Sequence, residues 1–214
     1  METNDELVEY LIRTGYLKSE NIIEAFKKID RKDFILPEYQ SMAYKDKPIR
    51  TFSNQTTSAP SIIAIMLEML KPFEGAMVYE IGTGSGYMTA LLAEIVKDGI
   101  VVSIELFDKL ANFAKENIEK YGFRNVVLLH GDGKKDLLNA RLIYGSYELL
   151  ERALEKRFDR IVFGAAIKEV PSIWIQYSKR GTCIVGPFQL SYDQYLFKLV
   201  IDSVFGPVIF VPFL

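Results

Sequence analysis

The sequence predicts an α/β fold with a doubly wound, mostly parallel seven-stranded sheet, which ends in an antiparallel C-terminal hairpin and is preceded by N-terminal helices. Three observations predict it. Strand-like and helix-like patterns alternate from residue 58 to about residue 187, which favours parallel strands joined by helices. A glycine-rich turn follows the first of these strands. The last two strand-like runs lie too close together for a parallel crossover.

Residues 1–57 differ in pattern from the rest of the chain. Apolar residues recur at helical spacing in two short runs, which predicts two helices. The first run holds Leu7, Tyr10, Leu11 and Tyr16, and the second holds Ile22, Ile23, Phe26 and Ile29. Residues 31–57 are irregular and predict a long loop, a kind of segment that is often functional. We therefore expect residues 1–57 to pack as helices and a loop on a core domain of residues 58–214, together forming one compact unit.

The core domain is expected to begin with a helix and to continue with five strands. Residues 60–70 carry a helical apolar stripe, and Pro60 suits its first turn. Strands are expected at residues 76–81, 100–105, 125–130, 158–163 and 182–185. Helices are expected at residues 87–96, 106–118 and, as an extra amphipathic helix, 149–154. The handedness of such crossovers places helices on both faces of the sheet.

The C-terminal segment differs from this alternating pattern. Residues 195–201 and 208–211 are both strand-like, and only residues 202–207 join them. A connection of that length allows an antiparallel pair but no parallel crossover. We therefore expect the sheet to end in an antiparallel hairpin.

The composition excludes several classes of function. The 214 residues are 49% hydrophobic, which is enough apolar material for the core of one domain. The formal net charge of −2 provides no basic surface for phosphates, so nucleic acid is disfavoured as a partner. Cys183 and His130 are the single cysteine and the single histidine, which rules out an internal disulfide and a multi-histidine metal site. We expect Cys183 to be a buried core thiol and the protein to bind no metal.

Two terminal features bear on location. The first six residues are polar and acidic, whereas a secretory signal opens basic and then turns apolar. The apolar run of residues 208–214 is far shorter than the ~20 residues that a membrane helix needs. We therefore expect a cytoplasmic protein with no membrane partner. Nothing in the sequence points to an oligomeric state.

The glycine-rich turn, Gly82-Thr83-Gly84-Ser85-Gly86, marks the expected binding site. In an open parallel sheet, ligands bind beyond the carboxyl ends of the strands. Glycines let the backbone turn sharply and approach a ligand, and the following helix points its N-terminus at the site. The dinucleotide fingerprint Gly-x-Gly-x-x-Gly is incomplete, because Tyr87 or Thr89 stands where its third glycine would be. A nicotinamide dinucleotide is therefore disfavoured.

Acidic residues stand at the ends of three successive predicted strands. Glu80 would repel a pyrophosphate but suits a ligand that carries an ammonium and a sulfonium, as S-adenosylmethionine does. Glu105 stands where a carboxylate accepts hydrogen bonds from ribose hydroxyls. Asp132 would accept one from the adenine amine, although Gly131-Asp132-Gly133 can also be read as a simple turn. The pattern predicts that S-adenosylmethionine binds here and leaves as S-adenosylhomocysteine. The expected cofactor-binding residues are Glu80, Gly82, Thr83, Gly84, Gly86, Glu105, Leu106, Gly131, Asp132 and Gly133.

Seven segments, spread over nearly the whole chain, resemble a known family. They are Gln-Thr-Thr-Ser-Ala-Pro at residues 55–60, and residues 80–87, 102–105, 131–133, 158–161, 165–166 and 210–212. The chain resembles the protein-L-isoaspartate (D-aspartate) O-methyltransferases, which are class I S-adenosylmethionine-dependent methyltransferases with a Rossmann-like sheet. The resemblance implies a repair enzyme that methylates the free α-carboxylate of L-isoaspartyl residues in damaged proteins and peptides. It also implies that Thr57 and Ser58 are the catalytic residues, which hold this carboxylate beside the sulfonium.

Departures from the family pattern cluster around the expected peptide groove. Ser61 stands where the family commonly has histidine, and Gly164 where it often has threonine. Residues 50–54 replace glycines that are usual just before the first motif, and the stretch between Gly133 and Phe158 is longer than usual. These changes leave two alternatives open. One is a methyltransferase of the same fold that acts on RNA or a small molecule, and the other is a cofactor-binding relative without activity.

Overall fold

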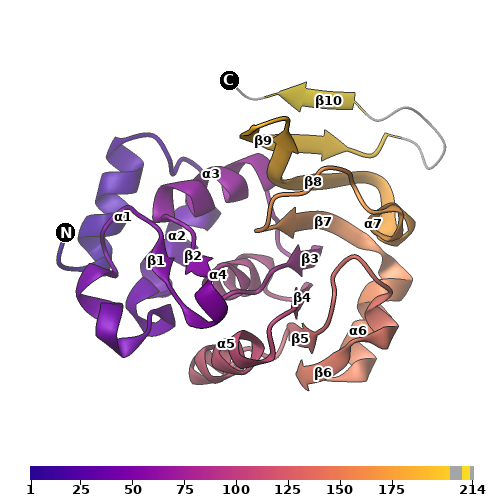
Figure 1. Cartoon of the computed structure of the whole chain (residues 1–214), viewed down its shortest axis with the longest axis horizontal. Coiled ribbons are helices and arrows are strands. Elements are labelled where there is room, and N and C mark those ends of the chain that lie inside the picture. Colours follow the sequence, from indigo (N-terminus) through magenta and orange to yellow (C-terminus); the bar gives the residue numbers. More distant parts are fainter. Residues whose placement is uncertain (203–208, 213–214) are drawn as a thin grey trace.

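The computed structural model describes residues 1–202 and, by their backbone, residues 209–212 (Figure 1). A central eight-stranded sheet has the order β10-β9-β8-β7-β3-β4-β5-β6, and a separate two-stranded ladder joins β1 to β2. Helices cover both faces of the central sheet (Figure 1). This arrangement confirms the predicted doubly wound α/β class. Within the described part of the chain, no helix is both long and apolar enough to cross a bilayer.

The parallel part of the sheet consists of the five strands that the sequence predicts. They are β3 (Met77–Ile81), β4 (Ile100–Glu105), β5 (Val126–His130), β7 (Phe158–Phe163) and β8 (Ser178–Leu190). The strands β4 and β5 lie on one side of β3, and β7 and β8 lie on the other. The strand order therefore reverses at β3. Sheets of this kind bind ligands in the crevice at such a reversal, beyond the carboxyl ends of the strands.

The antiparallel part of the sheet is larger than predicted. The strand β8 continues past residue 185 and turns directly into β9 (Asp193–Val200), which pairs with β10 (Ile209–Pro212). The predicted pairing of the last two strand-like runs is confirmed. An eighth strand, β6 (Arg141–Tyr144), pairs antiparallel with β5 at the far edge. The sequence does not predict β6, because four residues are too few to show a strand periodicity.

Both predicted N-terminal helices are present, as α1 (Asn4–Arg13) and α2 (Glu20–Lys28). The predicted loop of residues 31–57 contains several short elements. They are the 3-10 helices η1 (Arg31–Phe34), η2 (Pro37–Met42) and η3 (Phe52–Asn54), and the strands β1 (Ile49–Arg50) and β2 (Thr56–Thr57). Because Ile49 pairs with Thr57 in the small ladder, the chain doubles back and presents residues 55–58 to the central sheet.

The remaining helices build the two layers. They are α3 (Pro60–Leu70), α4 (Tyr87–Val96), α5 (Asp108–Tyr121), the 3-10 helix η4 (Leu137–Asn139), α6 (Tyr147–Lys156) and α7 (Ser172–Tyr177). The extra helix predicted near residues 149–154 is confirmed as α6. One apolar cluster joins α1 to α5 with one face of the sheet, and a second joins α6 and α7 with the other face. The strand β3 serves both, since Val78 belongs to the first cluster and Met77 and Tyr79 to the second. The predicted division of the chain at residue 57 stays a prediction.

Candidate active site

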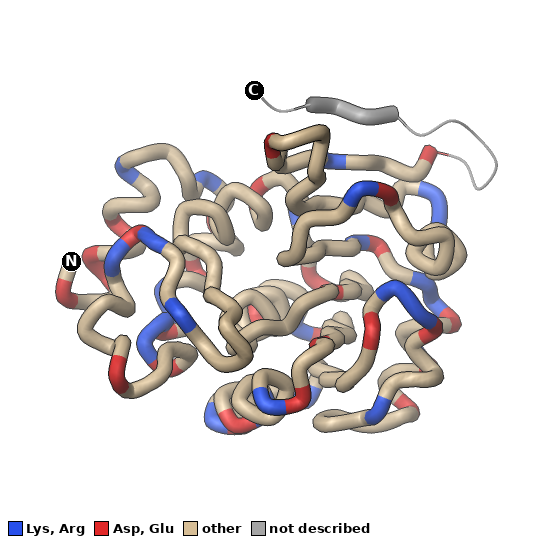
Figure 2. Tube along the Cα trace, viewed as in Figure 1, with Lys and Arg blue, Asp and Glu red and all other residues tan. Residues whose placement is uncertain are grey.

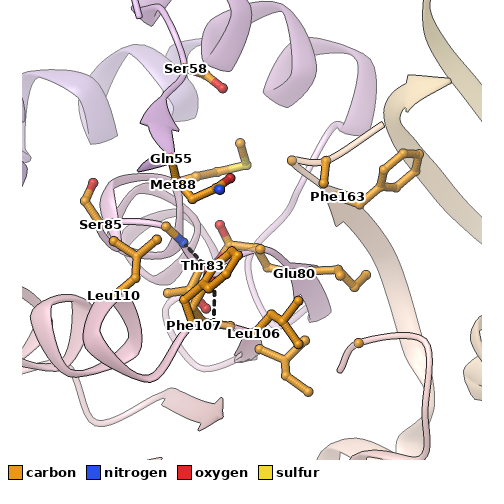
Figure 3. A pocket seen from close by; sticks show the side chains of 18 of the residues that line it. Gln55, Ser58, Glu80, Thr83, Ser85, Met88, Leu106, Phe107, Leu110 and Phe163 are labelled. Atoms are coloured by element: carbon orange, nitrogen blue, oxygen red, sulfur yellow. Dashed lines mark hydrogen bonds between the residues drawn. The ribbon is translucent and has the colours of Figure 1, made fainter. Parts of the chain in front are cut away.

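A cavity of about 350 Å³ opens at the carboxyl ends of β3, β4, β5 and β7 (Figure 3). All predicted site residues except Gly86 line it. They are Thr57, Ser58, Glu80, Gly82, Thr83, Gly84, Glu105, Leu106, Gly131, Asp132 and Gly133. Figure 3 shows Ser58 on one side of the cavity and Leu106 and Phe107 on the other. The fold thus brings the ends of separate strands together with a segment of the N-terminal region.

The glycine-rich turn has the backbone conformation for which glycine is suited. Gly82 has a φ of 90° and Gly84 a φ of 60°, both in the left-handed region that penalises a Cβ. The backbone N–H of Gly82 donates to the carbonyl of Ile104 at 2.8 Å, and the N–H of Gly164 donates to the carbonyl of Ile81 at 2.9 Å. These bonds hold the turn between the strands on either side of β3.

Gly86 is the one predicted site residue that does not line the cavity. It is the N-cap of α4, with a φ of 90°, and it lies outside the cavity lining. A Cβ at this position would lie 3.4 Å from both Ala114 and Ile118 of α5. The third glycine of the turn therefore permits the close packing of α4 against α5, which the sequence pattern alone does not distinguish from contact with a ligand.

Glu80 is a buried carboxylate in the wall of the cavity. Glu80 is only 2% exposed. Its Oε2 accepts hydrogen bonds from the hydroxyls of Thr89 at 2.5 Å and Ser103 at 2.8 Å. Burial raises the pKa of Glu80 to about 7, against the lowering effect of these two hydrogen bonds. A cation bound nearby would favour the ionised form. The protonation of Glu80 is therefore sensitive to the charge of a ligand.

Glu105 ties the end of β4 to the glycine-rich turn. Its Oε2 accepts from the backbone N–H of Gly84 at 2.9 Å, and its Oε1 accepts from the N–H of Phe107 at 3.1 Å. A carboxylate has about four lone-pair directions, so each oxygen can accept one more hydrogen bond. The side chain is held in place and can still accept hydrogen bonds from a diol.

The turn after β5, residues 131–133, is held by side chains of the second apolar cluster, the one that contains α6 and α7. The carbonyl of Gly133 accepts from the indole N–H of Trp174 at 2.6 Å and from the hydroxyl of Tyr79 at 3.1 Å. The Oδ1 of Asp132 accepts from the N–H of Lys134 at 3.0 Å, which is the geometry of a local turn. Asp132 also lines the cavity. The interpretation of Gly131-Asp132-Gly133 as a local turn is therefore compatible with its interpretation as a ligand-binding segment.

The predicted carboxylate-binding pair is held by a residue that the sequence pattern does not single out. Arg31, at the start of η1, donates through Nη2 to the hydroxyl of Thr57 at 3.3 Å and to the carbonyl of Ser58 at 3.1 Å. Thr57 is buried and Ser58 is half-buried. The helix α3 begins two residues later, and the N–H of Ser61 donates to Asp46 Oδ1 at 2.9 Å.

Other residues line the cavity without being predicted. They include Gln55, Met88, Phe107, Leu110, Phe163 and Trp174. Gln55 lies within a predicted segment, and Met88 and Phe107 directly follow predicted residues, which is the signal that could have found them. Trp174 has no such neighbour and reaches the cavity only through the fold. In the parts of the chain that the structure describes, no group of His, Cys, Asp and Glu side chains is arranged to hold a metal ion.

Similarity to known proteins identifies the family. The sequence profile of the family described as Protein-L-isoaspartate(D-aspartate) O-methyltransferase (PCMT) matches residues 2–144. A protein-L-isoaspartate O-methyltransferase from Pyrobaculum islandicum is 38% identical over 195 residues, which cover 90% of this chain and 87% of the relative. A protein of the same name from Ignicoccus hospitalis is 35% identical, over 99% of this chain and 97% of its own length. The chain belongs to this family.

Solved structures of this family share the fold. A protein-L-isoaspartate O-methyltransferase structure that is 29% identical matches 94% of this chain and 60% of its own, with a TM-score of 0.77. A Plasmodium falciparum structure of the same description, in complex with S-adenosyl-L-homocysteine, matches 100% of this chain and 95% of its own with a TM-score of 0.82. That protein is 23% identical, so it supports the fold alone. The predicted family and fold are confirmed.

The segment of residues 50–54, where the resemblance leads us to expect glycines, has backbone angles that favour glycine. Ser53 and Asn54 have φ values of 58° and 57°, in the left-handed region. Phe52 anchors the segment on α5, with its ring 5.4 Å from that of Phe113 and 4.4 Å from the Lys109 ammonium. Side-chain packing thus holds this segment on α5, directly before the cavity lining begins at Gln55.

Proposed function

We propose that this chain is an S-adenosylmethionine-dependent methyltransferase that methylates the free α-carboxylate of L-isoaspartyl residues in damaged proteins and peptides. One observation carries the proposal. Thr57 and Ser58 line the same cavity as Glu80 and Glu105, although they come from opposite ends of the site. A methyl donor held at the strand ends would thus lie beside a carboxylate held at residues 57–58.

The strand ends fit S-adenosylmethionine. Glu105 has the free lone pairs that two ribose hydroxyls need, and Asp132 lies at the end of the next strand, where adenine is expected. Glu80 provides a carboxylate whose ionised form a cationic ligand stabilises. The cavity volume of about 350 Å³ lies in the usual range for small-molecule sites. When bound, S-adenosylmethionine supplies an electrophilic methyl group.

The acceptor requires little from the protein beyond alignment. A carboxylate with a pKa near ~4 is ionised at neutral pH, so it needs no general base to attack a methyl group. The hydroxyls of Thr57 and Ser58 can donate hydrogen bonds to its oxygens. The enzyme then has to hold the carboxylate oxygen, the methyl carbon and the sulfur in a line and to exclude water.

The test is methyl transfer from labelled S-adenosylmethionine to an isoaspartyl peptide and to its aspartyl twin. We expect transfer to the first and none to the second. An equal absence of transfer to both peptides would reject the proposal. Thr57→Val and Ser58→Ala are expected to lower the rate while leaving S-adenosylhomocysteine binding intact, because they change the acceptor side of the cavity.

A second candidate is a methyltransferase of the same fold with another acceptor. The altered segment of residues 50–54 and Ser61 favour it, because in the sequence they flank the lining residues 55–58. Basic and acidic residues are interspersed along the trace and form no single basic stretch (Figure 2), and the net charge is −2, which argues against RNA. Transfer to bulk tRNA or to a panel of small molecules, with none to the isoaspartyl peptide, would support this candidate. Calorimetry that detects cofactor binding without turnover on any acceptor would instead support an inactive relative.

Isoaspartyl proteins and peptides are accordingly the partners that we propose. A cytoplasmic location stays a prediction, and so do the individual roles of the site residues.

A further inference from the structure

Arg31 is a fully buried arginine behind the acceptor side of the cavity. Arg31 is 0% exposed. Its guanidinium donates hydrogen bonds to four backbone carbonyls and one hydroxyl. The acceptors are the carbonyls of Ala43, Lys45, Lys47 and Ser58, and the hydroxyl of Thr57. None of these acceptors is a carboxylate. The hydrogen bonds of this cation therefore go to neutral acceptors only.

Arg31 nevertheless carries its charge at neutral pH. Burial lowers the pKa of Arg31 to about 10, and the charge of Asp46 acts against this shift. The group is thus protonated across the physiological range. A buried charge is costly to maintain, and among the described residues Arg31 has no ion-pair partner within 4 Å. An anion bound beside Arg31 would meet a positive charge that no ion pair within 4 Å neutralises.

The hydroxyl of Thr57 connects this charge to a residue of the cavity lining. It accepts a hydrogen bond from Arg31 Nη2 at 3.3 Å, and its residue lines the cavity. No acceptor for its own proton is found in the described part of the chain. Because a guanidinium is a charged donor, the bond polarises the hydroxyl and strengthens it as a donor to the next group. Arg31 also donates to the carbonyl of Ser58, so both residues of the acceptor pair are attached to the same cation.

We propose that Arg31 is a positioning residue for the methyl-accepting carboxylate. Arg31 donates to the oxygen of the Thr57 hydroxyl, which leaves the hydroxyl proton free to donate into the cavity. The charge of Arg31 also attracts the carboxylate from roughly 6 Å, the length of two hydrogen bonds in series. The inference rests on the proposed function, since it concerns the same site and an anionic acceptor. It predicts an effect on peptide binding that passes through the Thr57 hydroxyl.

A purely structural role makes a different prediction. Arg31 also ties residues 43–47 to the rest of the N-terminal region, so its loss could act by loosening that segment. Tyr44→Phe is the matched control for this effect. It removes the hydrogen bonds from the Tyr44 hydroxyl to both Asp30 oxygens, at 3.0 Å each, and leaves the bond between Arg31 and Thr57 in place.

The experiment compares Arg31→Gln, Arg31→Lys and Tyr44→Phe. For each, kcat and KM for an isoaspartyl peptide are measured, together with calorimetric S-adenosylhomocysteine binding and the thermal midpoint. We expect Arg31→Gln to raise the peptide KM on the order of ten-fold, since a charge-assisted hydrogen bond is lost. Arg31→Lys keeps the charge and is expected to raise it less. S-adenosylhomocysteine affinity should stay within about two-fold, because the strand ends are unchanged.

A double-mutant cycle with Thr57 separates the positioning role of Arg31 from a purely structural role. The cycle uses Arg31→Lys, so it can still be measured if Arg31→Gln fails to fold. The effect of Arg31→Lys on the peptide KM should persist beside Thr57→Ser, which keeps a hydroxyl, and should disappear beside Thr57→Val, which removes it. Equal effects in all backgrounds would overturn the inference, as would an equal rise in KM caused by Tyr44→Phe. If the unmodified chain transfers no methyl group to the isoaspartyl peptide, the proposed function fails and this inference fails with it. An active unmodified chain with an unchanged KM in the Arg31 variants contradicts the inference alone.

Discussion

The carboxylate of Glu105 accepts a hydrogen bond from the backbone N–H of Gly84 at 2.9 Å, so the end of β4 and the glycine-rich turn after β3 hold each other in place. This bond crosses from one strand to its parallel neighbour at the edge where the cavity opens. A residue in this position can act on a ligand in two ways. It can contact the ligand directly, and it can keep the turn in the shape that receives it.

Glu105→Ala is expected to weaken S-adenosylhomocysteine binding by about ten-fold to about a hundred-fold, since hydrogen bonds to a charged group are worth about 1.5–3 kcal/mol. Isothermal calorimetry measures the change. Glu116→Ala is the matched control, because Glu116 is an exposed carboxylate on α5 outside the cavity lining. Unchanged affinity in Glu105→Ala would show that neither the direct contact nor the support of Gly84 matters.

Gly133→Ala is expected to lower the free energy of unfolding by about 1–3 kcal/mol. A Cβ there would lie 2.6 Å from Ile81 Cγ2 and 3.0 Å from Ile104 Cγ2, both methyl groups on stiff β-branched side chains. Urea denaturation measures the loss. Gly164→Ala provides the contrast, since its Cβ would meet nothing closer than 3.7 Å, and we expect a change within about 0.5 kcal/mol. Equal losses in the two variants would contradict the packing argument.

Glu80 is expected to make the folded state less stable as the pH rises. Burial raises its pKa from 4.5 to about 7, so between these values the folded state holds a proton that the unfolded state has released. By linkage, the free energy of unfolding falls with rising pH across this window, by a few kcal/mol in order of magnitude. Glu80→Gln stays neutral and should lose this contribution. Denaturation series from pH 4 to pH 8 compare the two proteins, and parallel curves would refute the assignment.

The same residue predicts a coupling between binding and protons. A cationic ligand favours ionised Glu80, so S-adenosylmethionine binding near pH 6.5 should release a fraction of a proton. Calorimetry in two buffers of different ionisation enthalpy measures that release, and Glu80→Gln should abolish it. Release that persists undiminished in the variant would assign the proton to another group.

Trp174 is expected to report ligand binding by its fluorescence. It is the single tryptophan of the chain, its residue is 0% exposed, and it lines the cavity. Titration with S-adenosylhomocysteine should change its emission, and Trp174→Phe should remove that signal. The variant also loses the 2.6 Å hydrogen bond to Gly133, so we expect a stability loss of about 1 kcal/mol. An emission spectrum that does not respond to saturating ligand would place the ligand away from this wall.

The residues at the strand ends show how much of the site can be predicted from the local sequence pattern. Glu80, Glu105 and Asp132 could be placed together from the sequence, because parallel strands deliver their carboxyl ends to one edge of a sheet. Gly86 marks the limit of such reasoning, because it lies outside the cavity lining. Its φ of 90° and its place after two other glycines look alike whether the close neighbour is a ligand or, as here, the helix α5.

Two contacts in the site had no local signal at all. Arg31 meets Thr57 across 26 positions of the chain, and Trp174 meets Gly133 across 41. The first depends on the short ladder that folds residues 49–57 back on themselves, and the second on the path from β7 to α7. Loop paths of this kind are set by packing between distant residues, and no periodicity records them.

By itself, the sequence determined the alternation of strands and helices, the glycine-rich turn after β3, and the acidic residues at the strand ends, since each follows from the spacing of nearby residues. The tertiary structure alone established that Gly86 serves helix packing, that β6 extends the sheet, and that a buried cation stands behind Thr57. The physical reason is that burial and hydrogen-bond partners depend on which distant segments meet, whereas periodicity depends only on neighbours along the chain.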